Sequence, residues 1–342
     1  MSDVAHRITL AGSDLSFDCD QQDTLLRSAL RAGIAFPYEC NVGACGNCKF
    51  ELLEGAVDVK WQQAPAWTDK DRARNRYLGC QCSPRGDCII KLRPAAQYAP
   101  IHAPRRVTGT LTGRRPVTHD IHEFCFELSA DMRFEPGQYA LLELPGVAGV
   151  RAYSMSNIAE QPRILHFQVR RVPNGQGSAV LFDTLESGAR IDIDGPYGMA
   201  YLRRDVPRDI LCVAGGSGLA PMISIARGVA ADPSLANLKL HFLYGGRTAR
   251  DVCGRDMLAQ LPGFDERLHF EAAISDDTQE HACEPWTGHV GYVHDLADLL
   301  FGDRLRDMEI YFAGPPAMGM AIQRTLLARK VPFEQVHFDQ FY

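Results

Sequence analysis

The sequence predicts a multidomain protein with an α+β unit, an antiparallel β-barrel and an α/β unit that contains a doubly wound parallel sheet. Residues 1–98 carry short strand patterns around one helical stretch, and residues 105–205 carry alternating strands with glycine and proline turns. Residues 206–342 alternate buried strands with helices. Residues 99–104, between the first two units, are interpreted as a linker because proline and alanine dominate there.

Charge and hydropathy exclude several classes of protein. The net charge of −6 over 342 residues argues against nucleic acid as the main partner. The first residues lack the basic region and apolar run of a secretory signal, and no stretch approaches the roughly 20 apolar residues of a membrane span. We therefore expect a cytoplasmic protein without a membrane partner. In that compartment the eleven cysteines are expected to be buried thiols or a metal-binding or redox-active group, not disulfides.

Local patterns define the elements of the first unit. Residues 23–33 form an amphipathic helix pattern, which Asp23 is expected to cap and Gly33 to end. Strands are expected at residues 8–12, 14–19, 49–55 and 88–92.

Three cysteines lie close together after this helix. Four residues separate Cys40 from Cys45, and two separate Cys45 from Cys48. This is the spacing of plant-type [2Fe–2S] ligands, which need a fourth thiolate later in the chain, and Cys80 supplies it. A zinc site is the alternative, but zinc sites usually pair two short Cys-x2–4-Cys motifs.

The residues around these cysteines support a cluster loop. Gly43 and Gly46 allow left-handed turns that bring backbone N–H groups close to the sulfurs, where hydrogen bonds tune the reduction potential. Cys82 competes with Cys80 as the fourth ligand. The other cysteines have no partner spacing and are interpreted as small core residues: Cys19, Cys88, Cys125, Cys212, Cys253 and Cys283.

A second motif, "RAYSMSN", occupies residues 151–157 of the predicted barrel. An exposed strand end with an arginine is common, but this one directly precedes a parallel-sheet unit. Arg151 can pair with a pyrophosphate, Tyr153 can stack or hydrogen-bond along a flavin, and Ser154 can hydrogen-bond the flavin at N5.

The stretch "GQGS", residues 175–178, follows this motif at a predicted helix start. The helix is expected to begin at Ser178. A helix N-terminus with a serine and small neighbours is an anion site, so the same pyrophosphate is the expected ligand.

A third motif, "CVAGGSGLAPM" at residues 212–222, reads as a strand, a glycine-rich turn and a helix start, with Pro221 in the first helical turn. The turn can present N–H groups to a pyrophosphate, although it lacks the G-x-G-x-x-G pattern. A tight strand-to-helix turn without a ligand is the alternative. Gly314 and Pro315 end the last long strand at the sheet edge where ligands bind in open α/β sheets.

Together these motifs resemble the NADH-dependent reductase components of bacterial aromatic-ring oxygenases, most closely those of toluene and related monooxygenases. The resemblance covers nearly the whole chain and is most specific at residues 23–55, 151–157, 215–222 and 331–342. It implies a β-grasp ferredoxin domain (1–98), an FAD-binding barrel (105–205) and an NAD-binding domain (206–342), and it favours Cys80 over Cys82.

The family implies FAD, a [2Fe–2S] cluster and NADH as cofactors. Hydride would pass from NADH to FAD, and single electrons would then pass through the cluster to a terminal oxygenase or a small Rieske ferredoxin. A diiron and a Rieske partner both remain open. A flavin and iron–sulfur redox sensor or a stand-alone NADH oxidase are the alternatives, and the chain shows no output or oxygen-activating module that would favour either.

The family also implies roles for individual residues. Ser154, Phe341 and Tyr342 are the expected catalytic positions near the flavin, with Asp339 as a nearby acid. Relatives commonly carry a cysteine where this chain has Ala313, so reasoning about that thiol does not carry over. The expected cofactor contacts are Arg151, Tyr153, Ser154, Asn157, Gln168, Val169, Arg170, Gly175, Gly177 and Ser178 for FAD, and Gly215, Gly216, Ser217, Gly218, Pro221, Gly314 and Pro315 for the nicotinamide nucleotide.

The choice between NADH and NADPH depends on the loop after the second strand of the parallel sheet. An acidic residue there favours a free 2′-hydroxyl, and an arginine favours a 2′-phosphate. The loop offers Arg247, Arg250 and Asp251, so the residues alone leave both donors open, and the family favours NADH.

Overall fold

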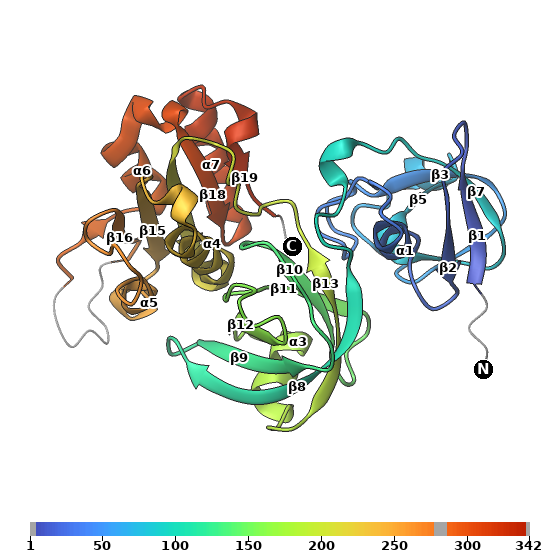
Figure 1. Cartoon of the computed structure of the whole chain (residues 1–342), viewed down its shortest axis with the longest axis horizontal. Helices are drawn as coiled ribbons and strands as arrows, with labels where there is room; N and C mark the ends of the chain where they lie inside the picture. The colour runs from blue at the N-terminus through green and yellow to red at the C-terminus, as the bar shows by residue number, and fades with distance from the viewer. Residues whose placement is uncertain (1–4, 277–285, 340–342) are drawn as a thin grey trace.

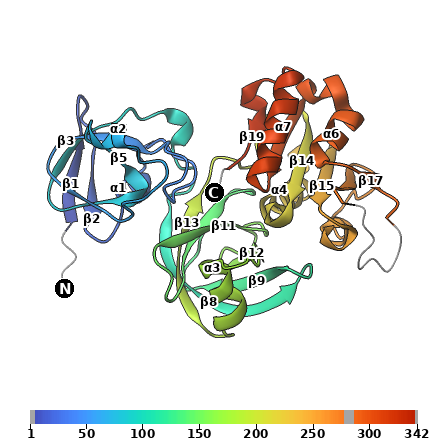
Figure 2. The ribbon, with the colours of Figure 1, turned by 180° about the vertical axis from the view of Figure 1, so that it is seen from behind.

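The computed structural model describes residues 5–276 and 286–339. Figure 1 shows three units, with the N-terminal unit beside the barrel and the parallel-sheet unit on the barrel's other side. Figure 2 shows the same arrangement from behind. In the described part of the chain, no helix combines the length and the apolar character needed to cross a membrane.

The N-terminal unit is a five-stranded mixed sheet with one helix packed against it. The strand order is β2-β1-β7-β3-β5, in which β1 and β7 are parallel and the other pairs antiparallel. Leu25, Leu26 and Leu30 of the helix are fully buried against the sheet. The bounds are β1 Ala5–Leu10, β2 Ser16–Asp20, α1 Leu25–Arg31, β3 Lys49–Glu54, β5 Arg76–Leu78 and β7 Cys88–Lys91, with the smaller elements β4 Val57–Val59, α2 Asp69–Arg72 and β6 Cys82–Pro84.

The expected cap of the helix is wrong by one residue. Thr24 is the N-cap, and its hydroxyl accepts a hydrogen bond from the backbone N–H of Arg27. The carboxylate of Asp23 instead accepts hydrogen bonds from the N–H of Thr24 and the hydroxyl of Ser28, and it pairs with Arg31. Both residue types favour N-caps, so the local sequence alone did not separate them.

The middle unit is a six-stranded antiparallel barrel with the strand order β11-β10-β13-β8-β9-β12. A bridge between Met155 and Phe167 brings its two edge strands together. The expected helix begins earlier than Ser178, since α3 spans Gln176–Ala179 and a π-helical turn follows at Val180–Thr184. The strand bounds are β8 Arg105–Pro116, β9 Ile121–Leu128, β10 Tyr139–Glu143, β11 Val150–Ser154, β12 Ile164–Arg170 and β13 Arg190–Tyr197.

The C-terminal unit is a parallel sheet with the strand order β17-β16-β15-β14-β18-β19. Alternate residues of β14 enter two separate cores, so both faces of the sheet are covered, by α4 on one side and by α6 and α7 on the other. The bounds are β14 Asp209–Gly215, α4 Leu219–Ala231, β15 Leu240–Gly246, α5 Arg255–Leu258, β16 Leu268–Ile274, β17 His289–Val290, α6 Val293–Phe301, β18 Met308–Ala313, α7 Pro316–Ala328 and β19 Val336–His337.

A buried ion pair joins the N-terminal unit to the barrel. Arg31, the last residue of α1, donates from Nη2 to Oδ2 of Asp194 on β13 at 2.5 Å. The other carboxylate oxygen of Asp194 accepts from the hydroxyl of Tyr197 at 2.9 Å. Only 6% of the Asp194 side chain is exposed. A looser pair, Arg106 with Asp23 at 3.8 Å, crosses the same boundary.

Removing one partner of this pair should be costly, because the other charge would stay buried and unpaired. We expect Arg31→Met to lower the free energy of unfolding of the N-terminal unit by about 3–5 kcal/mol. The control is Arg7→Met, which breaks an exposed pair with Asp18 and should cost about 1 kcal/mol or less. Urea unfolding followed by circular dichroism measures both, and equal losses would contradict a special role for Arg31.

The last described residue joins the C-terminal unit to the barrel. Oδ1 of Asp339 accepts a hydrogen bond from the N–H of Met199 at 3.3 Å. Although the residue keeps some exposed surface, its Oδ2 is buried and has no hydrogen-bond partner within the described residues. Burial, opposed by the N–H of Met199 and assisted by the charge of Glu39, raises the pKa of Asp339 to about 7.

This raised pKa makes stability depend on pH. The unfolded carboxyl ionises near pH 4, so the wild-type protein should lose stability between about pH 4 and pH 7, by about 1.4 kcal/mol for each pKa unit of difference. We expect Asp339→Asn to raise the melting temperature at pH 8 and to give a much smaller gain near pH 4.5. The control is Asp205→Asn, an exposed carboxylate. A melting-temperature difference that is the same at both pH values would contradict the assignment.

Candidate functional site

The structure brings the four predicted ligand cysteines together. The Sγ atoms of Cys48 and Cys80 are 3.4 Å apart, and the Sγ of Cys40 accepts from the N–H groups of Ala44 and Cys45, each at 3.3 Å. A hydrogen bond from the Cys45 thiol, and then those from backbone N–H groups, lower the pKa of Cys40 to about 5 against the effect of burial. A thiolate is therefore favoured at Cys40, as metal ligation requires.

This donor set fits an iron–sulfur cluster. Two sulfurs bound to one tetrahedral metal by bonds of about 2.3 Å lie about 3.8 Å apart, close to the separation of Cys48 and Cys80. Cys40 and Cys45 form the second close pair of thiols. Two such pairs, with N–H groups directed at a sulfur, are what a two-iron centre needs.

Backbone conformation makes the cysteine loop possible. Gly43 and Gly46 have φ angles of 92° and 83°, in the left-handed region that the sequence led us to expect. Space is also limited, because a Cβ on Gly43 would lie 3.1 Å from the ring of Trp61 and one on Gly46 would lie 3.3 Å from Ala66. Side chains at either position would disturb the loop.

The remaining cysteines of the described residues form no hydrogen bond with the four predicted ligands. Cys82 is buried in β6, and burial, followed by the charge of Cys48, raises the pKa of its thiol. Of the other six cysteines interpreted as core residues, Cys19, Cys88 and Cys212 are buried, whereas Cys125 and Cys253 are half-exposed and Cys283 is outside the described residues.

The barrel strand β11 forms the candidate flavin surface. All five of its residues are half-buried, as expected of a strand that lines a binding surface. A Cβ on Gly177 would lie 3.0 Å from Cγ of Arg151 and 3.1 Å from the hydroxyl of Tyr153, so only glycine leaves this space open. Burial raises the pKa of Tyr153 to about 12, which keeps its hydroxyl protonated. These residues fit a phosphate-bearing ring cofactor.

The helix-start motif is engaged with its own loop. The hydroxyl of Ser178 accepts from the N–H of Val172 and donates to the carbonyl of Gly175, each at 3.1 Å. Ser178 therefore holds the turn that places Gly177 against Arg151 and Tyr153. Ser154, the last residue of β11, pairs with Tyr139 across the sheet.

Three expected flavin contacts make hydrogen bonds or packing contacts within the protein. The amide of Gln168 donates to the buried carboxylate of Glu123 at 2.9 Å, and Val169 is buried in the core. The Asn157 side chain accepts from the N–H of His166 and donates to the carbonyl of Ile164, and its own carbonyl accepts from Ser224 of α4. These side chains hold the strands and helix around the site together.

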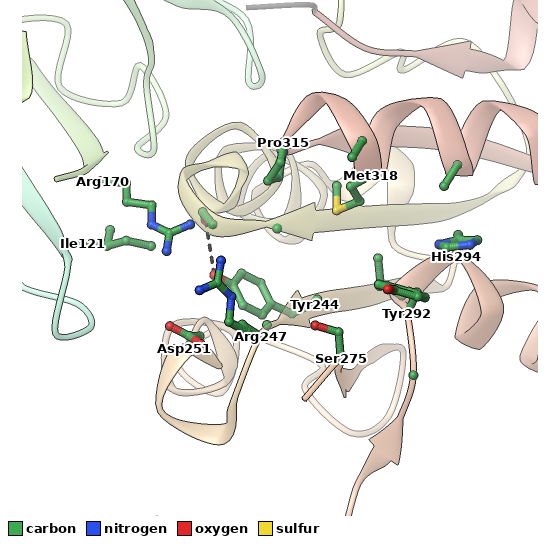
Figure 3. A pocket seen from close by; sticks show the side chains of 18 of the residues that line it. Ile121, Arg170, Tyr244, Arg247, Asp251, Ser275, Tyr292, His294, Pro315 and Met318 are labelled. Atoms are coloured by element: carbon green, nitrogen blue, oxygen red, sulfur yellow. Dashed lines mark hydrogen bonds between the residues drawn. The ribbon is translucent and has the colours of Figure 1, made fainter. Parts of the chain in front are cut away.

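A cavity of about 390 Å³ lies at the carboxyl edge of the parallel sheet. The strand order reverses between β14 and β18, and the cavity is beside this switch point, where open α/β sheets bind ligands. Figure 3 shows Tyr244, Arg247, Asp251 and Ser275 on one side of it and Pro315 and Met318 on the other.

Part of the predicted nucleotide motif lines this cavity, namely Gly215, Gly216 and Pro315. The cavity is also lined by Arg170, which was expected at the flavin. Ser217, Gly218 and Gly314 lie in the adjoining turns, and Pro221 is buried in α4.

A close approach explains one glycine of the motif. A Cβ on Gly218 would lie 2.0 Å from the carbonyl oxygen of Ala313, so no larger residue fits between the turn and β18. The turn therefore packs directly against the end of β18, which keeps both glycine-rich turns at one edge of the sheet. Tyr244 fixes the same turn by donating to the carbonyl of Gly216 at 3.3 Å.

Sequence reasoning missed several lining residues. Ser275 and Gly245 follow or end parallel strands, so the rule that ligands bind at carboxyl ends could have found them. Tyr292 and His294 come from the start of α6, and Ile121 comes from the barrel, and only the tertiary fold brings these to the cavity. The expected catalytic positions Phe341 and Tyr342 lie outside the described residues.

Three family models match the chain in the order of its units. They are described as a 2Fe-2S iron-sulfur cluster binding domain (residues 8–85), an oxidoreductase FAD-binding domain (residues 108–201) and an oxidoreductase NAD-binding domain (residues 212–324). The domain types, the fold class and the three cofactor classes expected from the sequence are thereby confirmed. The exact boundaries at 98, 105 and 206 stay predictions.

Relatives match over almost their full length. The chain is 38% identical to the ferredoxin–NAD(P)+ reductase CarAd of Metapseudomonas resinovorans, over 95% of this chain and 96% of the relative. It is 36% identical to the ferredoxin–NAD+ reductase component of an alkene monooxygenase system of Xanthobacter autotrophicus (95% and 98% covered). It is 32% identical to the xylene/toluene monooxygenase electron transfer component XylA of Pseudomonas putida (98% and 93% covered).

A solved structure agrees with these relatives. The ferredoxin reductase of carbazole 1,9a-dioxygenase superposes with a TM-score of 0.90 at 34% identity, and the match covers 100% of both chains. The cysteine loop, the flavin surface and the nucleotide cavity thus occur together on a known three-domain architecture. The chain belongs to the family of ferredoxin–NAD(P)+ reductases that are the electron-transfer components of oxygenase systems.

Proposed function

We propose that the protein oxidises NADH and delivers single electrons to a terminal oxygenase or a small Rieske ferredoxin. One observation carries this proposal: three candidate sites lie around one barrel. They are the four thiols of Cys40, Cys45, Cys48 and Cys80, the β11 surface, and the cavity at β14. Support for the partner comes from relatives whose names place them in dioxygenase and monooxygenase systems. The same proposal places the chain in the cytoplasm.

The protein's own groups would bind and orient the cofactors. When bound, FAD and the cluster supply the conversion of a two-electron hydride into single electrons. Arg151 would neutralise the pyrophosphate, with Gly177 leaving room for it, and Ser154 would offer a hydroxyl at the ring. The four cysteine thiolates would hold the irons, and the N–H groups of Ala44 and Cys45 would stabilise charge on sulfur.

The cavity supports NADH as the donor. Asp251 lines it, and its Oδ2 accepts from the N–H and hydroxyl of Thr248, which fixes the carboxylate in place. A carboxylate accepts from a ribose 2′-hydroxyl and repels a 2′-phosphate. Arg170, the guanidinium that the barrel contributes, is paired with Asp120 at 2.6 Å, which reduces its availability to a phosphate.

The central test uses electron acceptors of two kinds. Purified protein should reduce ferricyanide and cytochrome c with NADH, and a protein that reduces neither would refute the proposal. Cys80→Ser should abolish cytochrome c reduction and keep ferricyanide reduction, because only the cluster is lost. Cys82→Ser is the matched control and should keep both. The Sγ of Cys80 lies 3.4 Å from that of Cys48, and among the described residues no hydrogen bond joins Cys82 to Cys48. Metal analysis should find iron and acid-labile sulfide; zinc in their place would overturn the assignment of the cysteine site.

The donor preference is tested separately. We expect kcat/KM for NADH to exceed that for NADPH by about tenfold or more. The repulsion between the Asp251 carboxylate and a 2′-phosphate should cost about 1.4 kcal/mol or more, which corresponds to that ratio. Asp251→Asn should narrow this ratio by improving the use of NADPH, while the amide keeps the hydrogen bond to Thr248. Glu266→Gln, an exposed residue of the same domain, is the control. A ratio that Asp251→Asn leaves unchanged would assign the preference to another residue.

A further inference from the structure

A tyrosine of the flavin barrel, Tyr139, contacts the cysteine loop of the iron–sulfur unit. Tyr139 is the first residue of β10, and in the sheet register it stands opposite Ser154, the end of the candidate flavin strand. Its hydroxyl donates to the backbone carbonyl of Glu39 at 2.5 Å. Glu39 immediately precedes Cys40, so one side chain connects the strand paired with the candidate flavin strand to the cluster loop.

This contact is embedded in a buried cluster of aromatic rings. Tyr139 and Tyr197 are fully buried and Tyr38 is 4% exposed. Tyr38 packs edge-on to Tyr197 with ring centroids 6.2 Å apart, and Tyr197 lies 6.0 Å from Tyr139. The hydroxyl of Tyr38 accepts from the N–H of Gly198, a second hydrogen bond across the boundary. Figures 1 and 2 both place β13, which carries Tyr197, on the side of the barrel next to the N-terminal unit.

We propose that Tyr139 is a positioning residue that sets the placement of the cysteine loop relative to the flavin surface. Its phenol ring is rigid and its position is fixed by the β10–β11 register, so its hydroxyl defines where the carbonyl of Glu39 lies. The inference rests on the proposed transfer of electrons from flavin to cluster, a step whose rate depends on how the two groups are held.

The ion pair between Arg31 and Asp194 does not fill this role. It joins the end of α1 to β13 and, among the described residues, forms no hydrogen bond or ion pair with residues 39–48. It therefore holds the two units together without directing the loop. Tyr139 acts on the loop itself. Loss of its hydroxyl should therefore change the loop and leave the rest of the boundary in place.

The test is Tyr139→Phe in the cofactor-loaded protein, because it removes the hydroxyl and keeps the ring. In hydrogen exchange, amides of residues 36–48 should exchange several-fold faster than in wild type, while those of β1 and β7 should be unchanged. In stopped-flow experiments with NADH, flavin bleaching should keep its rate, and the later reduction of the cluster should slow several-fold.

Tyr311→Phe is the matched control. Tyr311 is also fully buried and its hydroxyl accepts from one backbone N–H, that of Arg203 at 2.9 Å, but it lies in the parallel-sheet unit. It should leave both measurements unchanged. Should Tyr139→Phe fail to fold, Tyr38→Phe removes the neighbouring hydrogen bond to Gly198 and should produce the same pattern in a weaker form.

The possible outcomes distinguish failure of the proposed function from failure of the positioning role of Tyr139. Wild-type protein whose cluster is not reduced by NADH would refute the proposed function. Wild-type protein that reduces its cluster, together with a Tyr139→Phe variant that matches it in loop exchange and in cluster reduction, would refute the positioning role alone. A variant that loses flavin or bleaches slowly would also refute it, by making Tyr139 a flavin-binding residue.

Discussion

The carboxylate of Asp194 is the group on which the arrangement of the units depends. Burial of a charge is tolerated when both oxygens are satisfied, and here Arg31 takes one oxygen and Tyr197 the other. Arg31 belongs to the N-terminal unit and Tyr197 to the barrel, so the contact fixes the relative position of the two units as well as stabilising them. It fixes the end of α1 against β13 and so holds the N-terminal unit against the barrel. The cysteine loop that follows α1 meets the barrel at the start of β10, where Tyr139 contacts it.

Short-range features of the sequence predicted much of the chemistry. Cys40, Cys45 and Cys48 lie within one loop, so their spacing alone restricts what they can bind, and the left-handed turns at Gly43 and Gly46 followed from the same constraint. The strand, turn and helix around Gly216 could be predicted equally well, because alternating patterns and glycine positions are properties of neighbouring residues. The order of the three units followed from the same patterns.

Contacts between distant residues could not be predicted in this way. Gln168 was expected at the flavin, yet its amide reaches Glu123 on the adjacent strand, because strand pairing decides which face it occupies. Arg170 was expected at the flavin, which stays a prediction, and it also lines the nucleotide cavity, since β12 extends to the boundary between the two domains. The contact of Tyr139 with the cysteine loop could not be predicted, because its partner is 100 residues away and is a backbone carbonyl, which no residue type signals.

The nucleotide cavity is built from two domains, and this limits how the protein can be recombined. Asp120, Ile121 and Arg170 come from the barrel, and the other lining residues come from the parallel-sheet domain. A chimera that receives only a relative's nucleotide domain would keep the barrel's half of the recognition surface and would inherit a mixed selectivity. Exchange of residues 120–128 and of β12 together with that domain would transfer the surface as a whole.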